Sequence, residues 1–178
     1  MNADPFRELA LAPNDRLEQL LRSAQGPAPE TLAGCEWRGF NLTWRVKVLG
    51  LQKFVKGFFE AGDGLEGYNI PVAQNGLDGP WRPLPSPDNP RRYAFYRVMR
   101  VDPQAVDHLY PQAILLDYGA SPRNPPRAIE SRLRDYVVQP DPANADLLLG
   151  KAYFAFGRYR LASNFFLIGR LGRVNWKP

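Results

Sequence analysis

Leu32-Ala33-Gly34-Cys35-Glu36-Trp37-Arg38-Gly39-Phe40-Asn41 sets a tryptophan between two glycines and opens a series of strand-like segments that extends almost to the C-terminus. Each segment is rich in aromatic and β-branched residues and is bounded by Gly, Pro, Asn or Asp. The pattern predicts about eight strands. They cover residues 36–48, 51–60, 65–73, 92–101, 112–119, 132–139, 146–157 and 159–171.

The connections between these segments favour antiparallel neighbours. Gly62-Asp63-Gly64 and Phe156-Gly157-Arg158 have the composition of tight hairpin turns. Two longer breaks, residues 75–91 with five prolines and residues 119–129 with three, interrupt the series. Because proline cannot donate to a central ladder, we expect both breaks at the mouth or edge of the sheet. The sequence therefore predicts a mostly β, antiparallel up-and-down β-barrel of about eight strands.

One helix precedes the strands. Asp15-Arg16-Leu17-Glu18 has the form of a capping box, and Leu17, Leu20 and Leu21 recur at helical spacing. These features predict a helix over residues 14–24, followed by a short turn at residues 29–32. We divide the chain into an N-terminal helical extension, residues 1–33, and a β-barrel domain, residues 34–178.

Alternation along the strands predicts which faces are buried. The first segment has an apolar face that includes Phe40 and Leu42, and a face that is polar after Trp37. The last two segments are apolar on both faces. We expect the helix at residues 14–24, or a second copy of the chain, to cover the outer face there.

Composition narrows the classes of protein. The chain has 178 residues, one cysteine, one histidine and a net charge of +5. One cysteine excludes an intramolecular disulfide and favours a reducing compartment, so we expect a cytoplasmic protein. The basic residues are scattered at strand spacing, which makes nucleic acid an unlikely partner. No apolar run is long enough to span a bilayer as a helix.

The sequence contains no motif that dictates a reaction. Nucleotide-binding glycine loops, phosphate loops and the nucleophile motif of serine hydrolases are all missing. His108 is the only histidine, so a histidine-rich metal site is excluded, and we predict neither a metal nor a cofactor.

The sparse signature around Trp37 resembles that of the calycin barrels, the lipocalin-like group. Its other elements are Asp135-Tyr136 in a later strand and Arg170 in the last one. The chain departs from the pattern in having its glycine three residues before Trp37, and Arg134 before the Asp-Tyr pair. The resemblance implies that Trp37 closes one end of the barrel, that Arg170 packs across its indole, and that a small molecule is held inside.

Ten Phe, eight Tyr and four Trp provide an apolar lining for such a cavity. A few polar residues within strands would contact a small hydrophobic or amphipathic ligand. One form of this hypothesis gives the ligand an anionic head. The candidate ligand-binding residues are Asn41, Arg45, Lys56, Tyr68, Asn69, Tyr118 and Lys151.

Two other functions stay open. Asp117-Tyr118 and Asp135-Tyr136 repeat in consecutive strands, and if both carboxylates face one side they would form an acid/base pair. Asp117, Asp135 and Tyr136 are therefore the candidate catalytic residues of a cofactor-independent isomerase, cyclase or dehydratase, unless the acids pair with Arg132 or Arg134. The third function is a protein-interaction module or homodimer that uses the two-sided apolar hairpin at the C-terminus.

Overall fold

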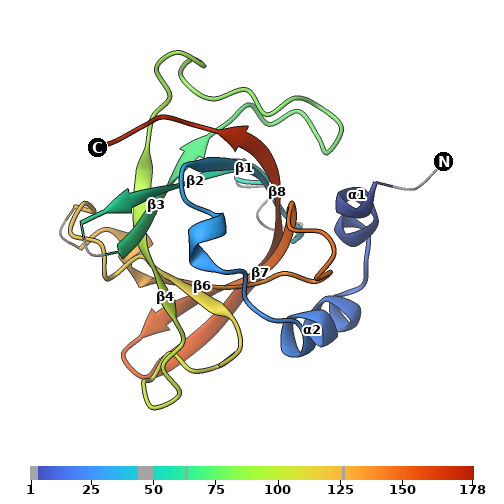
Figure 1. The fold of residues 1–178 in the computed structure, drawn as a ribbon, viewed down its shortest axis with the longest axis vertical. Helices are drawn as coiled ribbons and strands as arrows, with labels where there is room; N and C mark the ends of the chain where they lie inside the picture. Colours follow the sequence, from blue (N-terminus) through green and yellow to red (C-terminus); the bar gives the residue numbers. More distant parts are fainter. Residues whose placement is uncertain (1–3, 44–49, 63, 126) are drawn as a thin grey trace.

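The computed structural model describes residues 4–43, 50–62, 64–125 and 127–178, and these residues form a closed barrel of eight antiparallel strands. Each strand pairs with its neighbours in the chain, and β1 closes the ring by pairing with β8 (Figure 1). The strands are β1 (Cys35–Asn41), β2 (Lys53–Ala61), β3 (Gly64–Pro71), β4 (Tyr93–Arg100), β5 (Ile114–Asp117), β6 (Leu133–Val138), β7 (Leu147–Phe156) and β8 (Tyr159–Arg173). The predicted up-and-down barrel is confirmed.

The observed strands match the predicted segments to within a few residues at each end. The one larger difference is the first strand, predicted to residue 48: β1 ends at Asn41, residues 42 and 43 are not strand, and residues 44–48 lie outside the described part of the chain. At the predicted C-terminal hairpin, Phe156 pairs with Tyr159, and Gly157 adopts a φ of 58° that suits glycine in a two-residue turn.

The barrel has two unlike ends. The odd-numbered strands all run toward one end, which carries the long connections after β3 and β5, and we call it the loop end. Trp37 lies near the start of β1, at the opposite end. There the 3₁₀ helix η1 (Pro29–Thr31) crosses the barrel (Figure 1). Leu32, which follows it, is fully buried in the interior.

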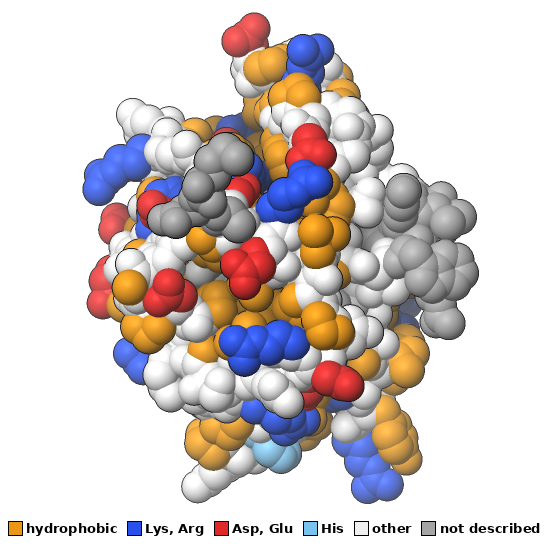
Figure 2. Space-filling model, turned by 90° about the vertical axis from the view of Figure 1, so that its right-hand side faces the viewer, with side chains coloured by type: hydrophobic (Ala, Val, Ile, Leu, Met, Phe, Trp, Pro, Cys, Tyr) orange, Lys and Arg blue, Asp and Glu red, His pale blue; other side chains and the backbone are white. Residues whose placement is uncertain are grey.

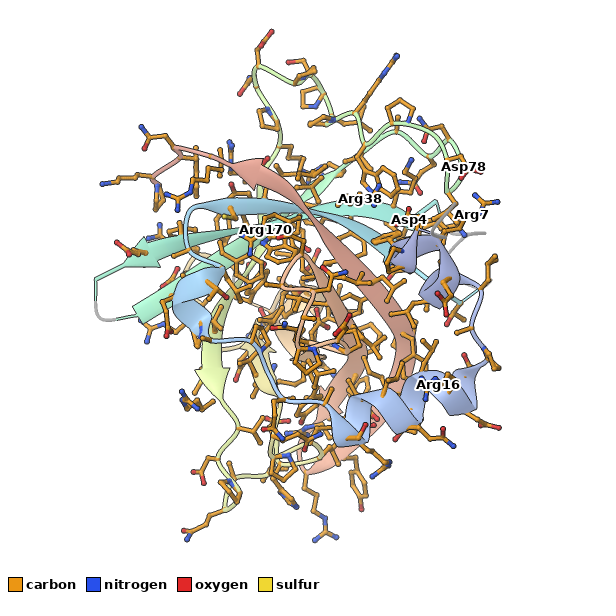
Figure 3. All side chains as sticks on the ribbon, turned by 45° about the vertical axis from the view of Figure 1, so that its right-hand side comes forward. Asp4, Arg7, Arg16, Arg38, Asp78 and Arg170 are labelled. Atoms are coloured by element: carbon orange, nitrogen blue, oxygen red, sulfur yellow. The ribbon has the colours of Figure 1, made fainter. Side chains whose placement is uncertain are left out.

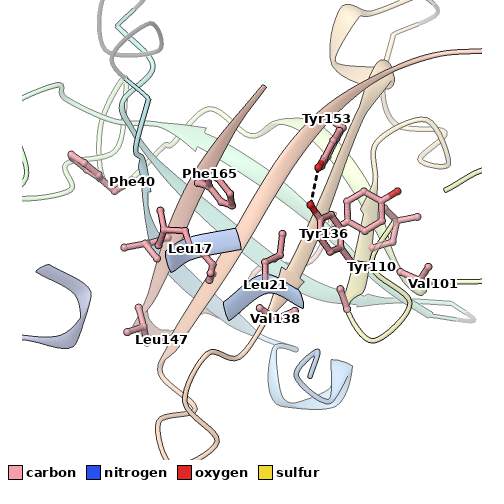
Figure 4. Close-up of a cluster of buried hydrophobic side chains, with 14 of the residues drawn as sticks. Leu17, Leu21, Phe40, Val101, Tyr110, Tyr136, Val138, Leu147, Tyr153 and Phe165 are labelled. Atoms are coloured by element: carbon pink, nitrogen blue, oxygen red, sulfur yellow. Dashed lines mark hydrogen bonds between the residues drawn. The ribbon is translucent and has the colours of Figure 1, made fainter. Parts of the chain in front are cut away.

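Two helices cover part of the outer wall. α1 (Pro5–Ala10) packs on β8 and α2 (Asn14–Ser23) packs on β7. Leu17 and Leu21 of α2 are completely buried against outward-facing side chains of β7 and β8 (Figure 4). Away from the β7–β8 turn, the apolar outer face of the last two strands is thus covered by the helices, which is one of the two predicted alternatives.

The N-terminus differs from the prediction in two respects. α1 was not predicted; Asp4 caps it through a bond from the backbone N–H of Phe6 to its carboxylate. The capping box was wrong, because α2 begins at Asn14 after Pro13 and none of the described side chains caps it. Since Asp15 lies inside the first turn, its side chain is not at the cap position.

Candidate functional site

A group of polar side chains meets inside the barrel. It consists of Lys56 on β2, Asn69 on β3, Tyr118 directly after β5 and Asp135 on β6, and we call it the Lys56 cluster. The Nζ atom of Lys56 lies 3.1 Å from Asn69 Oδ1, 2.5 Å from the Tyr118 hydroxyl and 3.0 Å from Asp135 Oδ2. The three protons of the ammonium therefore have three acceptors.

The other members bond to one another. The hydroxyl of Tyr118 donates to Asp135 Oδ2 at 2.9 Å, and the amide of Asn69 donates to the backbone oxygen of Ala94 at 3.1 Å. Lys56 is 2% exposed and Asp135 is 4% exposed, so the pair is removed from solvent. A buried charge pair is tolerated when such hydrogen bonds complete it.

Aromatic rings surround the ammonium of Lys56. The ring centres of Phe54, Tyr96, Tyr118 and Phe166 lie 4.8–5.4 Å from Nζ. Cations are attracted to aromatic faces at such distances, most strongly where water is excluded. The site is a single cation enclosed by one carboxylate, two neutral acceptors and four rings.

Phe54 and Phe166 lie between this cation and the loop end. Each ring fills the space over a glycine on the neighbouring strand: a Cβ added to Gly39 or Gly150 would fall 2.1 Å from the ring of Phe54 or Phe166. The two rings meet edge to face, 6.0 Å apart. Along β2 and β8 both rings lie nearer the loop end than the row of Lys56, Trp37 and Arg170.

Burial dominates the electrostatics of the cluster. Burial lowers the pKa of Lys56 below its ordinary value, and the adjacent Asp135 carboxylate opposes that shift. Burial, and then the charge of Asp135, raise the pKa of the Tyr118 hydroxyl well above its ordinary value. Tyr118 is therefore a neutral hydrogen-bond donor at physiological pH.

Two predicted ligand-binding residues lie on the outer wall instead. The hydroxyl of Tyr68 donates to Glu36 at 2.9 Å. Lys151 pairs with Glu18 of α2 at 2.7 Å. Both side chains stand on the opposite face of their strands from the cluster, and they join the barrel to neighbouring segments.

Asn41 is also separate from the cluster. It lies at the loop end, where its amide donates to the backbone oxygen of Leu51 and its Oδ1 accepts from Asn164. Arg45, the remaining candidate, lies outside the described residues.

The predicted pair of carboxylates is not formed. Across β5 and β6, Asp135 stands opposite Leu116 while Asp117 stands opposite Arg134, so the two acids point to opposite faces. Asp117 pairs with Arg134 at 3.0 Å on the outside. Tyr136 also points outward, into the cluster of tyrosines that packs near α2 (Figure 4). The shared face assumed for Asp117 and Asp135 was wrong because the register of the two strands is offset by one residue.

Trp37 is fully buried, and the guanidinium carbon of Arg170 lies 4.4 Å from the centre of its ring. Arg170, which is labelled in Figure 3, also donates to Asp146 at 2.6 Å and to the backbone oxygen of Thr31 at 3.3 Å. This is the geometry that the calycin resemblance implies for these two residues. It ties η1 to the last strand at the end opposite the loop end.

The sequence did not single out three residues of the site. Phe54, Tyr96 and Phe166 line it, but a phenylalanine or tyrosine in a strand is ordinarily core. The sequence does hold a signal for the pairing of Lys56 with Asn69, two residues that it did single out. The turn between β2 and β3 is short, so Ala61 pairs with Gly64, and this register sets Lys56 directly opposite Asn69.

Two surface pockets lie apart from the Lys56 cluster. One of about 360 Å³ lies beside α2, between Glu18, Lys151 and Asn164. The other, of about 500 Å³, lies between residues 104–109 and the turn of the β7–β8 hairpin. Among the described residues no group of histidine, cysteine and acidic side chains is arranged to hold a metal ion.

Comparisons with protein-family models, with curated proteins and with solved structures found no match to this chain. In the described part of the chain, neither helix has the length and apolar composition needed to cross a bilayer.

Proposed function

We propose that this protein binds a small amphipathic molecule inside the barrel, with the polar and in particular anionic head of the molecule at Lys56. The observation that supports the proposal is the convergence of Lys56, Asn69, Tyr118 and Asp135 on one point of an aromatic interior. Apolar pockets with a few fixed polar groups are the usual form of such sites. On this proposal the barrel is calycin-like in use as well as in shape, and the single cysteine suits the cytoplasm.

The energetics of the interior favour a binding role for the cluster. Replacing a buried ion pair by apolar side chains of similar volume often leaves a protein equally stable, or about 1–4 kcal/mol more stable. A barrel of this size can fill its interior with apolar side chains. A charged pair in the middle of that interior is therefore better explained by recognition than by stability.

The proposal requires the ligand to displace part of what fills the barrel. Phe54 is only partly buried, and it forms the layer over Lys56 with Phe166. Rotation of these two rings would open a path from the loop end. An anionic head would then compete with Asp135 for the protons of Lys56, while Tyr118 and Asn69 supply neutral contacts.

A titration with the anionic fluorescent probe 8-anilinonaphthalene-1-sulfonate, competed by octanoate or by 1-octanol, tests this function. We expect saturable binding that octanoate displaces better than octanol. The double variant Lys56→Met/Asp135→Leu should lose the preference for octanoate. Lys151→Met, which changes a lysine on the outer wall, is the matched control and should keep it. Equal displacement by both competitors, or unchanged selectivity in the double variant, would reject the proposal.

The other two functions have less support. The acid/base pair for an enzyme is missing because Asp117 faces outward and is paired with Arg134. Of the apolar hairpin considered for a homodimer, the outer face from Leu147 to Tyr153 is covered by α1 and α2, and side chains near its turn stay exposed.

A further inference from the structure

We propose that the turn of the β7–β8 hairpin and the adjacent segment 104–109 form a surface that binds the face of an anionic lipid bilayer. We call it the hairpin surface, and it is separate from the Lys56 cluster. Its apolar members are Val106, Leu109, Phe156, Tyr159 and Leu161.

These apolar side chains are unusually exposed. Tyr159 is 67% exposed, Leu161 is 62% exposed, and Val106, Phe156 and Leu109 are between 38% and 51% exposed. Large apolar side chains that gather on a surface mark a contact with another molecule or a membrane more often than those scattered singly. Tyrosine in particular is favoured where one end of the ring is apolar and the other is wet.

Arginines flank the apolar side chains. The guanidinium of Arg132 lies 5.1 Å from the ring of Phe156, and that of Arg158 lies 5.5 Å from the ring of Tyr159. Among the described residues, no carboxylate lies within ion-pair distance of either arginine. Asp107 is the one acid in segments 104–109 and 156–161, and it is neutralised by Arg134 and Arg160. The surface therefore carries an uncompensated positive charge.

The shape of this region distinguishes a bilayer from a protein partner. The hairpin extends past the ring of the barrel, beside the segment that follows β4 (Figure 1). Figure 2 shows hydrophobic and basic side chains gathered around the single histidine at the lower end of that view. Between the two segments lies the pocket of about 500 Å³. Its lining includes the apolar Val106, Leu109 and Tyr159 and the basic Arg158 and Arg160.

A projecting apolar tip with cations beside it can insert shallowly into the headgroup region, while the pocket accepts a phosphate. This combination matches the chemistry of an anionic phospholipid: negative headgroups for the arginines and acyl chains for Tyr159 and Leu161. A flat protein surface has no hollow into which the projecting hairpin could insert. Asp107, the acid of this region, is already paired and does not neutralise the flanking arginines.

Co-sedimentation with vesicles tests the proposal, using phosphatidylcholine alone and phosphatidylcholine mixed with phosphatidylglycerol. We expect the protein to bind the mixed vesicles, to bind phosphatidylcholine alone weakly, and to be released by salt. Arg158→Gln should weaken binding about fivefold, as expected for one cation near an anionic surface. Tyr159→Ser/Leu161→Ser should weaken it at least about tenfold.

Matched controls come from elsewhere on the surface. Leu171→Ser changes an exposed leucine of the same strand near its other end, and Arg16→Gln changes an exposed arginine of α2 (Figure 3). Both should bind like the wild-type protein. Failure of the wild-type protein to bind mixed vesicles, or equal losses in controls and hairpin variants, overturns the proposal. All four variants alter exposed or half-exposed side chains, and thermal unfolding followed by circular dichroism verifies that they fold.

Discussion

Tyr118 and Tyr136 are the same residue type on neighbouring segments, one inside the barrel and one outside it. The hydroxyl of Tyr118 bonds to Lys56, Asp135 and Asn69. The buried hydroxyl of Tyr136 has no partner of good hydrogen-bond geometry among the described residues, and only the backbone N–H of Leu109 approaches it. They therefore provide a controlled comparison of what a hydroxyl contributes.

We predict that Tyr118→Phe lowers the free energy of unfolding by about 1–3 kcal/mol, because two charged groups lose a hydrogen-bond partner. Tyr136→Phe should be neutral or slightly stabilising, since it removes a polar atom that gains nothing by burial. Urea unfolding of both variants measures the two values. Equal losses in the two variants would contradict this account of the cluster.

The ion pair between Lys56 and Asp135 predicts a strongly non-additive pair of substitutions. Lys56→Met alone leaves a buried carboxylate without its counter-charge, and we expect a loss of about 3–5 kcal/mol. Lys56→Met/Asp135→Leu should recover most of this loss or exceed wild-type stability. The free energies of unfolding of wild type, both single variants and the double variant complete the cycle. Additive effects would show that the two charges do not depend on each other.

At the scale of elements, Glu18 joins α2 to the barrel beside the buried leucines of the helix. Glu18 accepts from Lys151 at 2.7 Å and from Tyr110 at 3.0 Å, and Tyr110 bonds in turn to Tyr153 (Figure 4). Burial tends to raise the pKa of Glu18, but these hydrogen bonds and the charge of Lys151 lower it below its ordinary value.

This lowered pKa gives a pH dependence of definite sign. The contribution of Glu18 to stability is complete above its ordinary pKa of 4.5 and is lost as the pH falls through the lower folded value. We predict that Glu18→Gln costs about 1–2 kcal/mol at neutral pH and that the difference from wild type shrinks on acidification. Urea unfolding at neutral and acidic pH measures both. A difference independent of pH would mean that the carboxylate is not used in docking α2.

The strands show what the sequence could and could not predict about the site. Apolar alternation and turn residues predicted eight strands, and the short β2–β3 turn contains the information that sets Lys56 opposite Asn69. The β5–β6 connection is long, so local sequence does not specify that register, and Asp117 was assigned to the wrong face. Short turns specify register, and long connections leave it to tertiary packing.

At the scale of the whole molecule, the fold follows from the sequence more completely than the site does. Away from their turn, both faces of β7 and β8 are apolar because the barrel interior takes one and α1 and α2 take the other. Phe156, Tyr159 and Leu161 near the turn lie beyond this cover and are exposed. The helices also explain why the apolar face of β1 is its outer one. Phe40, on that face, packs outside the barrel against the same cluster, while Trp37 on the other face fills the inside. Inside and outside cannot be told apart from polarity when both are buried.

The central claim is that Lys56, enclosed by four rings, receives the head of a ligand. Its side-chain resonances should be displaced by those rings from the resonances of the other lysines. In a ¹³C,¹⁵N-lysine-labelled sample titrated with octanoate, we predict that the Lys56 side-chain signals shift progressively and saturate, while those of Lys151 stay in place. Unchanged Lys56 signals at saturating octanoate, or shifts confined to the lysines of the outer wall, would contradict the account.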